Sequence, residues 1–231
     1  MAVDQEFKKN VFRAFYFPVI LITLLWLIKG VEYLSGLSLS GYGIYPMKAD
    51  GLPGILFAPL IHADFNHLFN NSFSLLILMA AIFYFYRPIA FKIIVLVWIV
   101  TGLCVWLGGR KAYHIGASGL VYGFASFLFF SGVLRKNIKL LAISLLVIFL
   151  YGGLIWGIFP LFPEMSWESH LFGGLTGLFF AFVYADEGPQ KEEKHWEEEQ
   201  DDEDEVPYWK VDEFATEENL KNNAHKPFTD D

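Results

Sequence analysis

The sequence predicts an all-α integral membrane protein, built as a bundle of six membrane-spanning helices. Of the 231 residues 55% are hydrophobic, and the mean hydropathy is +0.40. Apolar runs of about 20 residues, the length that crosses a bilayer as a helix, alternate with short polar or proline-containing breaks. Charge is also segregated, because the segment from Asp186 onward holds 18 acidic and five basic residues, whereas the preceding residues carry a small positive excess.

The breaks divide residues 15–185 into a six-helix transmembrane domain. The spans are predicted at Phe15–Leu34, His67–Tyr86, Ile89–Leu107, Ile115–Leu134, Leu140–Phe159 and Trp167–Ala185. The first apolar run is too long for a signal peptide and is interpreted as a spanning helix. Residues 35–61 are rich in glycine and proline yet stay apolar, which predicts a first outer loop associated with the membrane surface. The only cysteine, Cys104, excludes an internal disulfide and a multi-cysteine metal site.

Charge predicts the orientation. If the N-terminal segment 1–14 is cytoplasmic, the inner connections hold eight lysines and arginines and the outer ones four, so the positive-inside rule favours cytoplasmic N- and C-termini. We expect a multi-pass protein of a bacterial plasma membrane. The acidic tail, residues 186–231, lacks apolar periodicity and is predicted to be disordered and cytoplasmic. Its aromatic residues would suit a cytoplasmic partner, although a merely solvated tail is favoured.

Polar side chains gather near the outer ends of three predicted spans. They are His67 and Asn71 in the second span, with His62 just before it, Ser118 in the fourth and His170 in the sixth. At 1.5 Å rise per residue, all should lie within roughly 10 Å of the outer interface. Polar groups are costly in hydrocarbon and usually mark a site or a bundle interior. The pattern therefore predicts one shared site.

Small residues would bring two of these helices together. Gly119 and Gly123 lie four residues apart on the fourth span, as do Gly173 and Gly177 on the sixth. Faces of this kind let helix backbones approach closely in lipid. If they pack together, the Ser118 hydroxyl comes within hydrogen-bonding reach of the His170 imidazole.

A serine beside a histidine predicts nucleophilic catalysis. Serine is a weak nucleophile until a neighbouring base takes its proton, and histidine titrates near neutrality. No carboxylate is well placed, since Glu168 lies on another helix face and is expected in the outer loop, so we predict a Ser118–His170 dyad. Tyr122, one turn from Ser118, is the candidate to stack on the imidazole.

An oxyanion site is available at the same place. Ser118 is expected at a helix N-terminus, where backbone N–H groups lack partners within the helix. Gly116 and Gly119 allow a substrate to approach closely. His67 and Asn71 lie on one helix face and can both donate hydrogen bonds, although a purely structural pair is the alternative.

Three motifs together resemble those of rhomboid intramembrane serine proteases. Gly116-Ala117-Ser118-Gly119 is similar to the family's GxSG motif. His62, His67 and Asn71 resemble its HxxxxHxxxN pattern. His170, Gly173 and Gly177 resemble its HxxGxxxG pattern. The motifs follow the family's order, and the resemblance covers about residues 12–185.

The resemblance implies a rhomboid-like bundle in which Ser118 is the nucleophile and His170 the base. It implies His67, Asn71 and the Ser118 backbone N–H at the oxyanion site, Tyr122 stacked on the histidine, and single-span membrane proteins as substrates. The fifth helix and residues 35–61 would move around substrate entry. Two departures stand out: Ser169 replaces the alanine that usually precedes the histidine, and residues 35–61 lack the family's Trp-Arg pair.

Three other functions were weighed against proteolysis. A catalytically inactive relative that binds client transmembrane helices would typically lack the serine or the histidine, and both are present. A haem or metal protein using His62, His67 and His170 lacks a HExxH or Cys/His cluster. A transporter would need charged residues deep in the spans or broken helices in matched halves. We therefore expect no metal, no cofactor and no nucleic-acid partner.

Overall fold

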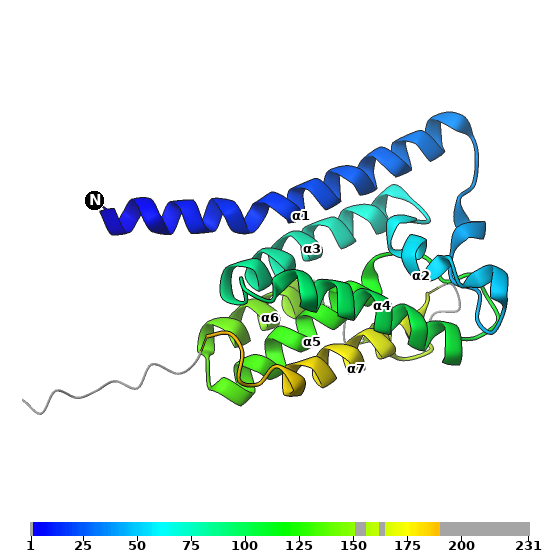
Figure 1. The fold of residues 1–231 in the computed structure, drawn as a ribbon. Coiled ribbons are helices and arrows are strands. Elements are labelled where there is room, and N and C mark those ends of the chain that lie inside the picture. Colours follow the sequence, from blue (N-terminus) through cyan, green and yellow to red (C-terminus); the bar gives the residue numbers. More distant parts are fainter. Residues whose placement is uncertain (1, 151–155, 162–164, 190–231) are drawn as a thin grey trace, which may run out of the picture. The chain divides into compact units, whose positions relative to one another are not determined.

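The computed structural model describes residues 2–150, 156–161 and 165–189. Over these ranges the chain forms seven α-helices and no β-strand, with one isolated β-bridge between Ile44 and His114 (Figure 1). The α-helices are α1 (Ala2–Ser35), α2 (Gly54–Phe57), α3 (Phe65–Phe85), α4 (Ala90–Gly108), α5 (Ser118–Arg135), α6 (Ile138–Leu150) and α7 (Trp167–Val183). The short 3₁₀ helices are η1 (Ser40–Tyr42), η2 (Ala49–Gly51), η3 (Ala58–Leu60) and η4 (Trp156–Ile158).

Among the residues that the structure describes, four helices are long and apolar enough to cross a membrane, so the chain is an integral membrane protein. By length and composition the spans are Gln5–Ser35, Phe65–Phe85, Ala90–Gly108 and Ser118–Arg135. The described parts of α6 and α7 have 13 and 17 residues. Each of the six predicted spans corresponds to one of the long helices, but a count of six crossings stays a prediction.

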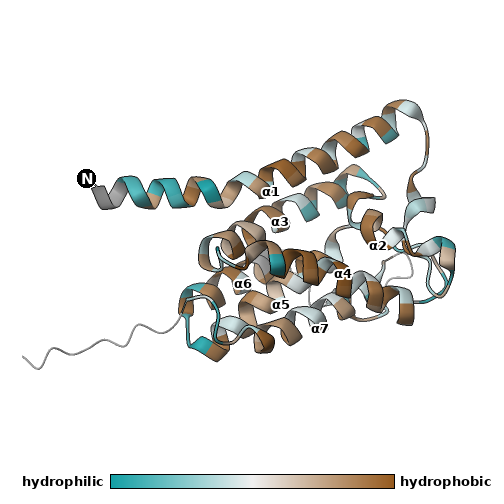
Figure 2. Cartoon of the chain, viewed as in Figure 1, coloured by the Kyte–Doolittle hydropathy of each residue, from teal (hydrophilic) through white to brown (hydrophobic). Residues whose placement is uncertain are grey.

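Many apolar side chains also lie on the outside of the bundle. Their exposure is unfavourable in water but not in the hydrocarbon of a membrane. Leu34, Phe149 and Phe182 are 85%, 82% and 59% exposed, and brown apolar segments run along the helices in Figure 2. Exposed apolar surface of this extent is rare on soluble monomers and fits contact with acyl chains.

Several helices do not begin where the predicted spans begin. The first helix begins at Ala2 and includes the polar residues that precede the predicted span from Phe15. The fourth begins at Ser118 rather than Ile115, because Gly116 has a φ of +105° that ends any helical path before it. Glu168 does not lie in the outer loop; it is in the first turn of α7 and 2% exposed.

The connection between α1 and α3 folds onto α4. It contains η1, η2, α2 and η3, and two tryptophans of α4 tie it down: Trp98 Nε1 donates to the Ile55 carbonyl at 3.0 Å, and Trp106 Nε1 to the Lys48 carbonyl at 2.9 Å. Its association with the membrane surface remains a prediction. The acidic tail from residue 190 lies outside the described residues.

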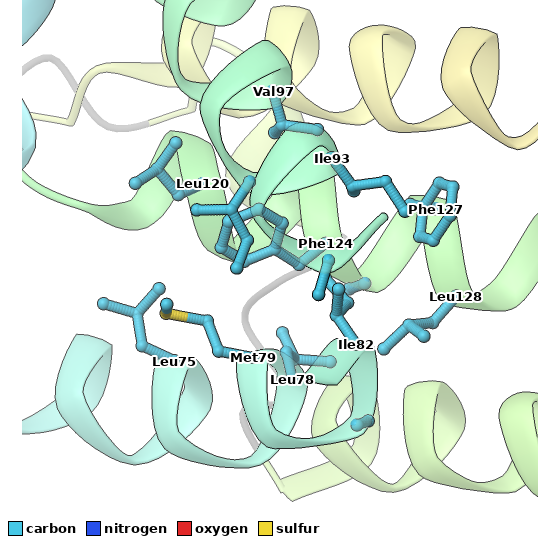
Figure 3. Close-up of a cluster of buried hydrophobic side chains, with 14 of the residues drawn as sticks. Leu75, Leu78, Met79, Ile82, Ile93, Val97, Leu120, Phe124, Phe127 and Leu128 are labelled. Atoms are coloured by element: carbon cyan, nitrogen blue, oxygen red, sulfur yellow. The ribbon is translucent and has the colours of Figure 1, made fainter. Parts of the chain in front are cut away.

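The core lies between α3, α4 and α5. Leu75, Leu78, Met79 and Ile82 point from α3 toward α5, where Phe124, Phe127 and Leu128 meet them (Figure 3). All seven are at most 3% exposed. This packing holds the N-terminal part of α3 close to the first turn of α5.

Glycines bring α5 and α7 into backbone contact. A β-carbon added to Gly177 would lie 2.9 Å from the carbonyl carbon of Gly123, and one added to Gly123 would collide with Val97 of α4. Ser126 Oγ adds a hydrogen bond to the Gly174 carbonyl at 2.7 Å. The two helices therefore approach as closely as helix backbones can.

Candidate active site

Ser118 and His170 meet at the N-terminal ends of α5 and α7. Ser118 is the first residue of α5, and His170 lies in the first turn of α7. Their Oγ and Nε2 atoms are 2.7 Å apart. His170 is 6% exposed, whereas Ser118 is partly exposed and lines a cavity. The hydroxyl is therefore accessible while the imidazole is shielded.

The second ring nitrogen of His170 fixes its tautomer. Nδ1 lies 2.8 Å from the Gly157 carbonyl oxygen, which can only accept a hydrogen bond, so Nδ1 carries the proton. Nε2 is then unprotonated in the neutral ring and accepts from the Ser118 hydroxyl. This arrangement prepares Nε2 to take the serine proton without a carboxylate.

Two residues hold the plane of the imidazole. Tyr122 stacks on the His170 ring with centroids 4.2 Å apart and planes 9° from parallel. Gly157 leaves the space that this stack needs, because a β-carbon there would overlap the Tyr122 hydroxyl and lie 3.0 Å from His170 Nδ1. The ring is thus held by one face and by one nitrogen.

His67 and Asn71 line the same cavity from α3. The cavity has a volume of about 780 Å³, and its walls include Ser118, His170, His67, Asn71 and Tyr122. Asn71 is 6% exposed, and its buried Nδ2 has no hydrogen-bond partner among the residues that the structure describes. A buried donor without a partner is unusual and calls for an explanation, such as a ligand atom. The His67 backbone is held by the α3 N-cap, Asp64, at 2.8 Å.

Gly116 makes room beside these donors. With its positive φ it places the chain so that a β-carbon would lie 2.6 Å from His67 Cε1 and 3.8 Å from Asn71 Nδ2. The Gly116 N–H is bound by the Ala58 carbonyl at 2.9 Å. Gly119 is also closely surrounded: a β-carbon there would lie 3.1 Å from the Ser169 carbonyl oxygen and 3.3 Å from Thr101 Cγ2. Gly173 lies against the Gly119 backbone.

His62 supports the segment that leads into Ser118 and does not line the cavity. It is 2% exposed, its ring meets His67 edge-on at 5.1 Å, and its Nε2 accepts from the Ala117 N–H at 3.4 Å. Burial, with a smaller effect of nearby positive charge, lowers the pKa of His62 to about 3, so the ring is neutral and able to accept. No group of three His, Cys, Asp or Glu side chains that could hold a metal occurs among the described residues.

His114 belongs to the site, although the sequence motifs do not identify it. His114 is 2% exposed, lines the cavity, and its ring binds Ser166 just before α7. The sequence signal that could have identified it is the cluster of polar residues around the first turn of α7, which are Ser166, Glu168 and Ser169.

The fold and the site define a helical membrane protein with a hydrogen-bonded serine–histidine pair at one end of the bundle. The sequence matches the model of the rhomboid domain over residues 50–187, which is more than half of the chain. The chain belongs to the rhomboid family, whose members are typically intramembrane proteases.

Bacterial proteins are among its relatives. A protein of Mycobacterium tuberculosis is 36% identical over 176 residues, covering 70% of this chain and 71% of its own. A protein of Mycobacterium leprae is 34% identical over 172 residues, covering 70% and 68% respectively. Both carry the name of uncharacterized proteins, so they support the family and leave the reaction to be argued from the site.

Proposed function

We propose that this chain is an intramembrane serine endopeptidase that cleaves transmembrane proteins near the outer face of the membrane. The observation that supports it most is the 2.7 Å contact between Ser118 Oγ and His170 Nε2, with Nδ1 bound to a carbonyl. Only this tautomer leaves Nε2 free to act as a base.

The proposed reaction begins when Ser118 Oγ attacks the scissile carbonyl and its proton passes to His170 Nε2. The tetrahedral oxyanion would accept hydrogen bonds from Asn71 Nδ2, His67 and the Ser118 backbone N–H. Collapse breaks the C–N bond, and the imidazolium returns its proton to the leaving amine. A water molecule, deprotonated by the same nitrogen, then hydrolyses the acyl-enzyme and regenerates Ser118.

The site favours substrates that come from the bilayer. The cavity lies at one end of helices that cross the membrane, and a helical substrate must unwind to expose its peptide carbonyl there. Single-span proteins with small, helix-breaking residues near the outer interface fit this requirement. We further propose six spans, both termini in the cytoplasm of a bacterium, and a tail free to bind a cytoplasmic partner.

A direct test is cleavage of a single-span reporter reconstituted with the protein in liposomes. Wild type should release a fragment of defined length, and Ser118→Ala should release none. Ser126→Ala removes a hydroxyl from the same helix away from the site and should keep activity. Equal cleavage by wild type and Ser118→Ala would refute Ser118 as the nucleophile. Binding without cleavage by either would favour the alternative, a catalytically inactive member that binds client helices.

A further inference from the structure

A chain of hydrogen bonds links the loop before α5 to the first turn of α7. His114 Nδ1 lies 2.5 Å from Ser166 Oγ, and Ser166 Oγ lies 2.6 Å from Ser169 Oγ. Ser169 directly precedes His170. The chain therefore ends one residue from the proposed base and begins four residues before the proposed nucleophile.

The chain has a definite direction. His114 Nε2 lies 3.0 Å from the Arg110 carbonyl oxygen, which accepts, so Nε2 carries the ring proton. Burial lowers the pKa of His114, which favours the neutral ring. Nδ1 must then accept from the Ser166 hydroxyl, and Ser166 in turn accepts from the Ser169 hydroxyl. The donor and the acceptor of each hydrogen bond in the chain are therefore defined.

His114 is a fixed anchor. Its backbone N–H donates to the Ile44 carbonyl at 2.8 Å, and its carbonyl accepts from the Ile44 N–H at 3.0 Å. A β-carbon added to Gly109 would lie 3.0 Å from His114 Nε2, so the ring fills a closely fitting space. The backbone bridge to Ile44 and the contacts of both ring nitrogens therefore hold the His114 side chain in place.

The Ser166 side chain binds His114 instead of capping α7. Ser166 is the N-cap residue of α7, yet its side chain makes no capping hydrogen bond. A serine cap typically stabilises a helix by about 1 kcal/mol. Here the hydroxyl connects two segments of the site instead of capping its own helix.

Arg110 makes a second tie between the same two segments. Its Nη2 donates to the Met165 carbonyl at 2.7 Å, and its backbone N–H donates to Glu168 Oε1 at 3.3 Å. The loop 109–117 therefore holds the start of α7 at two points, on both sides of Ser166.

We propose that His114 is a positioning residue that acts through Ser166 and Ser169 to hold His170 Nε2 against Ser118 Oγ. This inference rests on the proposed function. It also explains why serine replaces the family's usual alanine at position 169, since alanine has no hydroxyl to complete the hydrogen-bond chain. None of the three side chains has to touch the substrate.

The expected signature is a slower chemical step with unchanged binding. Loss of the link lets the first turn of α7 shift, and a displacement near 1 Å in a reacting group can reduce a rate by about 100-fold. Substrate and probe contacts elsewhere in the cavity stay the same. The rate of Ser118 acylation should fall while the apparent dissociation constant does not.

The test uses the intact protein in detergent and a fluorophosphonate probe that labels activated serines. Ser166→Ala should lower the maximal labelling rate about tenfold or more. Ser166→Thr keeps the hydroxyl and should restore the rate. Ser169→Ala removes only the end of the chain and should give a smaller decrease. Ser126→Ala is the matched control, because its hydroxyl also binds α7, at the Gly174 carbonyl, but away from the site. Thermal unfolding midpoints are measured for every variant.

The outcomes separate this inference from the proposed function. Slow labelling of Ser166→Ala at unchanged half-saturation, with rescue by threonine and normal labelling of Ser126→Ala, supports it. Wild-type rates in Ser166→Ala, failure of threonine to rescue, or an equal decrease in Ser126→Ala with equal loss of stability would overturn it. Absence of Ser118-dependent labelling in the wild type would instead refute the proposed function.

Discussion

Gly173 of α7 lies directly against the backbone of Gly119 on α5. A β-carbon on Gly173 would overlap the Gly119 carbonyl oxygen and lie 3.0 Å from its carbonyl carbon. Gly119 follows Ser118, and Gly173 lies one turn after His170. The closeness of these two glycines therefore sets the distance across which serine and histidine share a hydrogen bond.

Gly173→Ala should push α5 and α7 apart, because neither backbone can yield cheaply. Overpacking of this kind costs about 1–3 kcal/mol, so the unfolding midpoint and the cleavage rate should both fall. Gly174→Ala is the control, since nothing lies within 4 Å of a β-carbon there. Equal activity of the two variants would show that the close packing of α5 and α7 does not determine the Ser118–His170 geometry.

Asn71→Ala should lower the turnover number by about 10²–10³-fold with little change in KM, as expected for loss of an oxyanion donor. Its buried Nδ2 has no partner, so its removal should not reduce the unfolding midpoint. Ser72→Ala is the control variant. Ser72 Oγ hydrogen-bonds to the Leu68 carbonyl and to Trp26 on α1, so the turnover number should not fall as it does in Asn71→Ala. Normal turnover in Asn71→Ala would assign the oxyanion to other donors.

Tyr122→Leu should slow cleavage more than Tyr122→Phe, because the flat ring that stacks on His170 is retained only in the second variant. The comparison is made as initial rates at saturating substrate. If leucine serves as well as phenylalanine, stacking plays no part in orienting the imidazole.

Arg135→Met should lower the unfolding midpoint. The buried guanidinium binds the Tyr184 and Glu187 carbonyls after α7 and lies 5.4 Å from the Tyr86 ring. Hydrogen bonds from a charged donor are each worth about 1.5–3 kcal/mol. Arg87→Met removes an exposed arginine and should change the midpoint little. Similar midpoints in the two variants would contradict a clamp at this end of the bundle.

Acid should destabilise the fold through His62. Burial lowers the pKa of His62 from the ordinary 6.5 to about 3. Between these pKa values the unfolded chain binds a proton on His62 that the folded chain does not. The free energy of unfolding therefore loses nothing to His62 above pH 6.5 and decreases as the pH falls toward 3. The contribution is at most about 1.4 kcal/mol per pH unit. Unfolding midpoints of His62→Gln should depend less on pH over this range than those of wild type, and parallel curves would contradict the prediction.

The sequence predicted the positions of the long helices because apolar length and breaks such as Arg87-Pro88 are local signals. It also predicted which side chains gather, since Ser118, His170, His67 and Asn71 each lie near one end of a span. Helix ends were less predictable. The start of α5 depends on the positive φ of Gly116, which depends in turn on the space beside His67.

The contacts that loops make within the site were beyond sequence reasoning, unlike the Ser118–His170 pair. The bond from His170 to the Gly157 carbonyl and the link from His114 to Ser166 join residues 13 and 52 positions apart. Nothing local marks such partners, because they depend on how loops fold over the ends of the helices. The sequence does not identify His114 for this reason.

The most direct test of the account identifies the residue that a fluorophosphonate modifies. Purified protein is labelled, digested and analysed by mass spectrometry, with His170→Ala and Ser118→Ala in parallel. The account predicts a phosphonate adduct on Ser118 in the wild type, severely reduced in His170→Ala, and none in Ser118→Ala. An unmodified Ser118 in folded wild type, or undiminished labelling in His170→Ala, would contradict it.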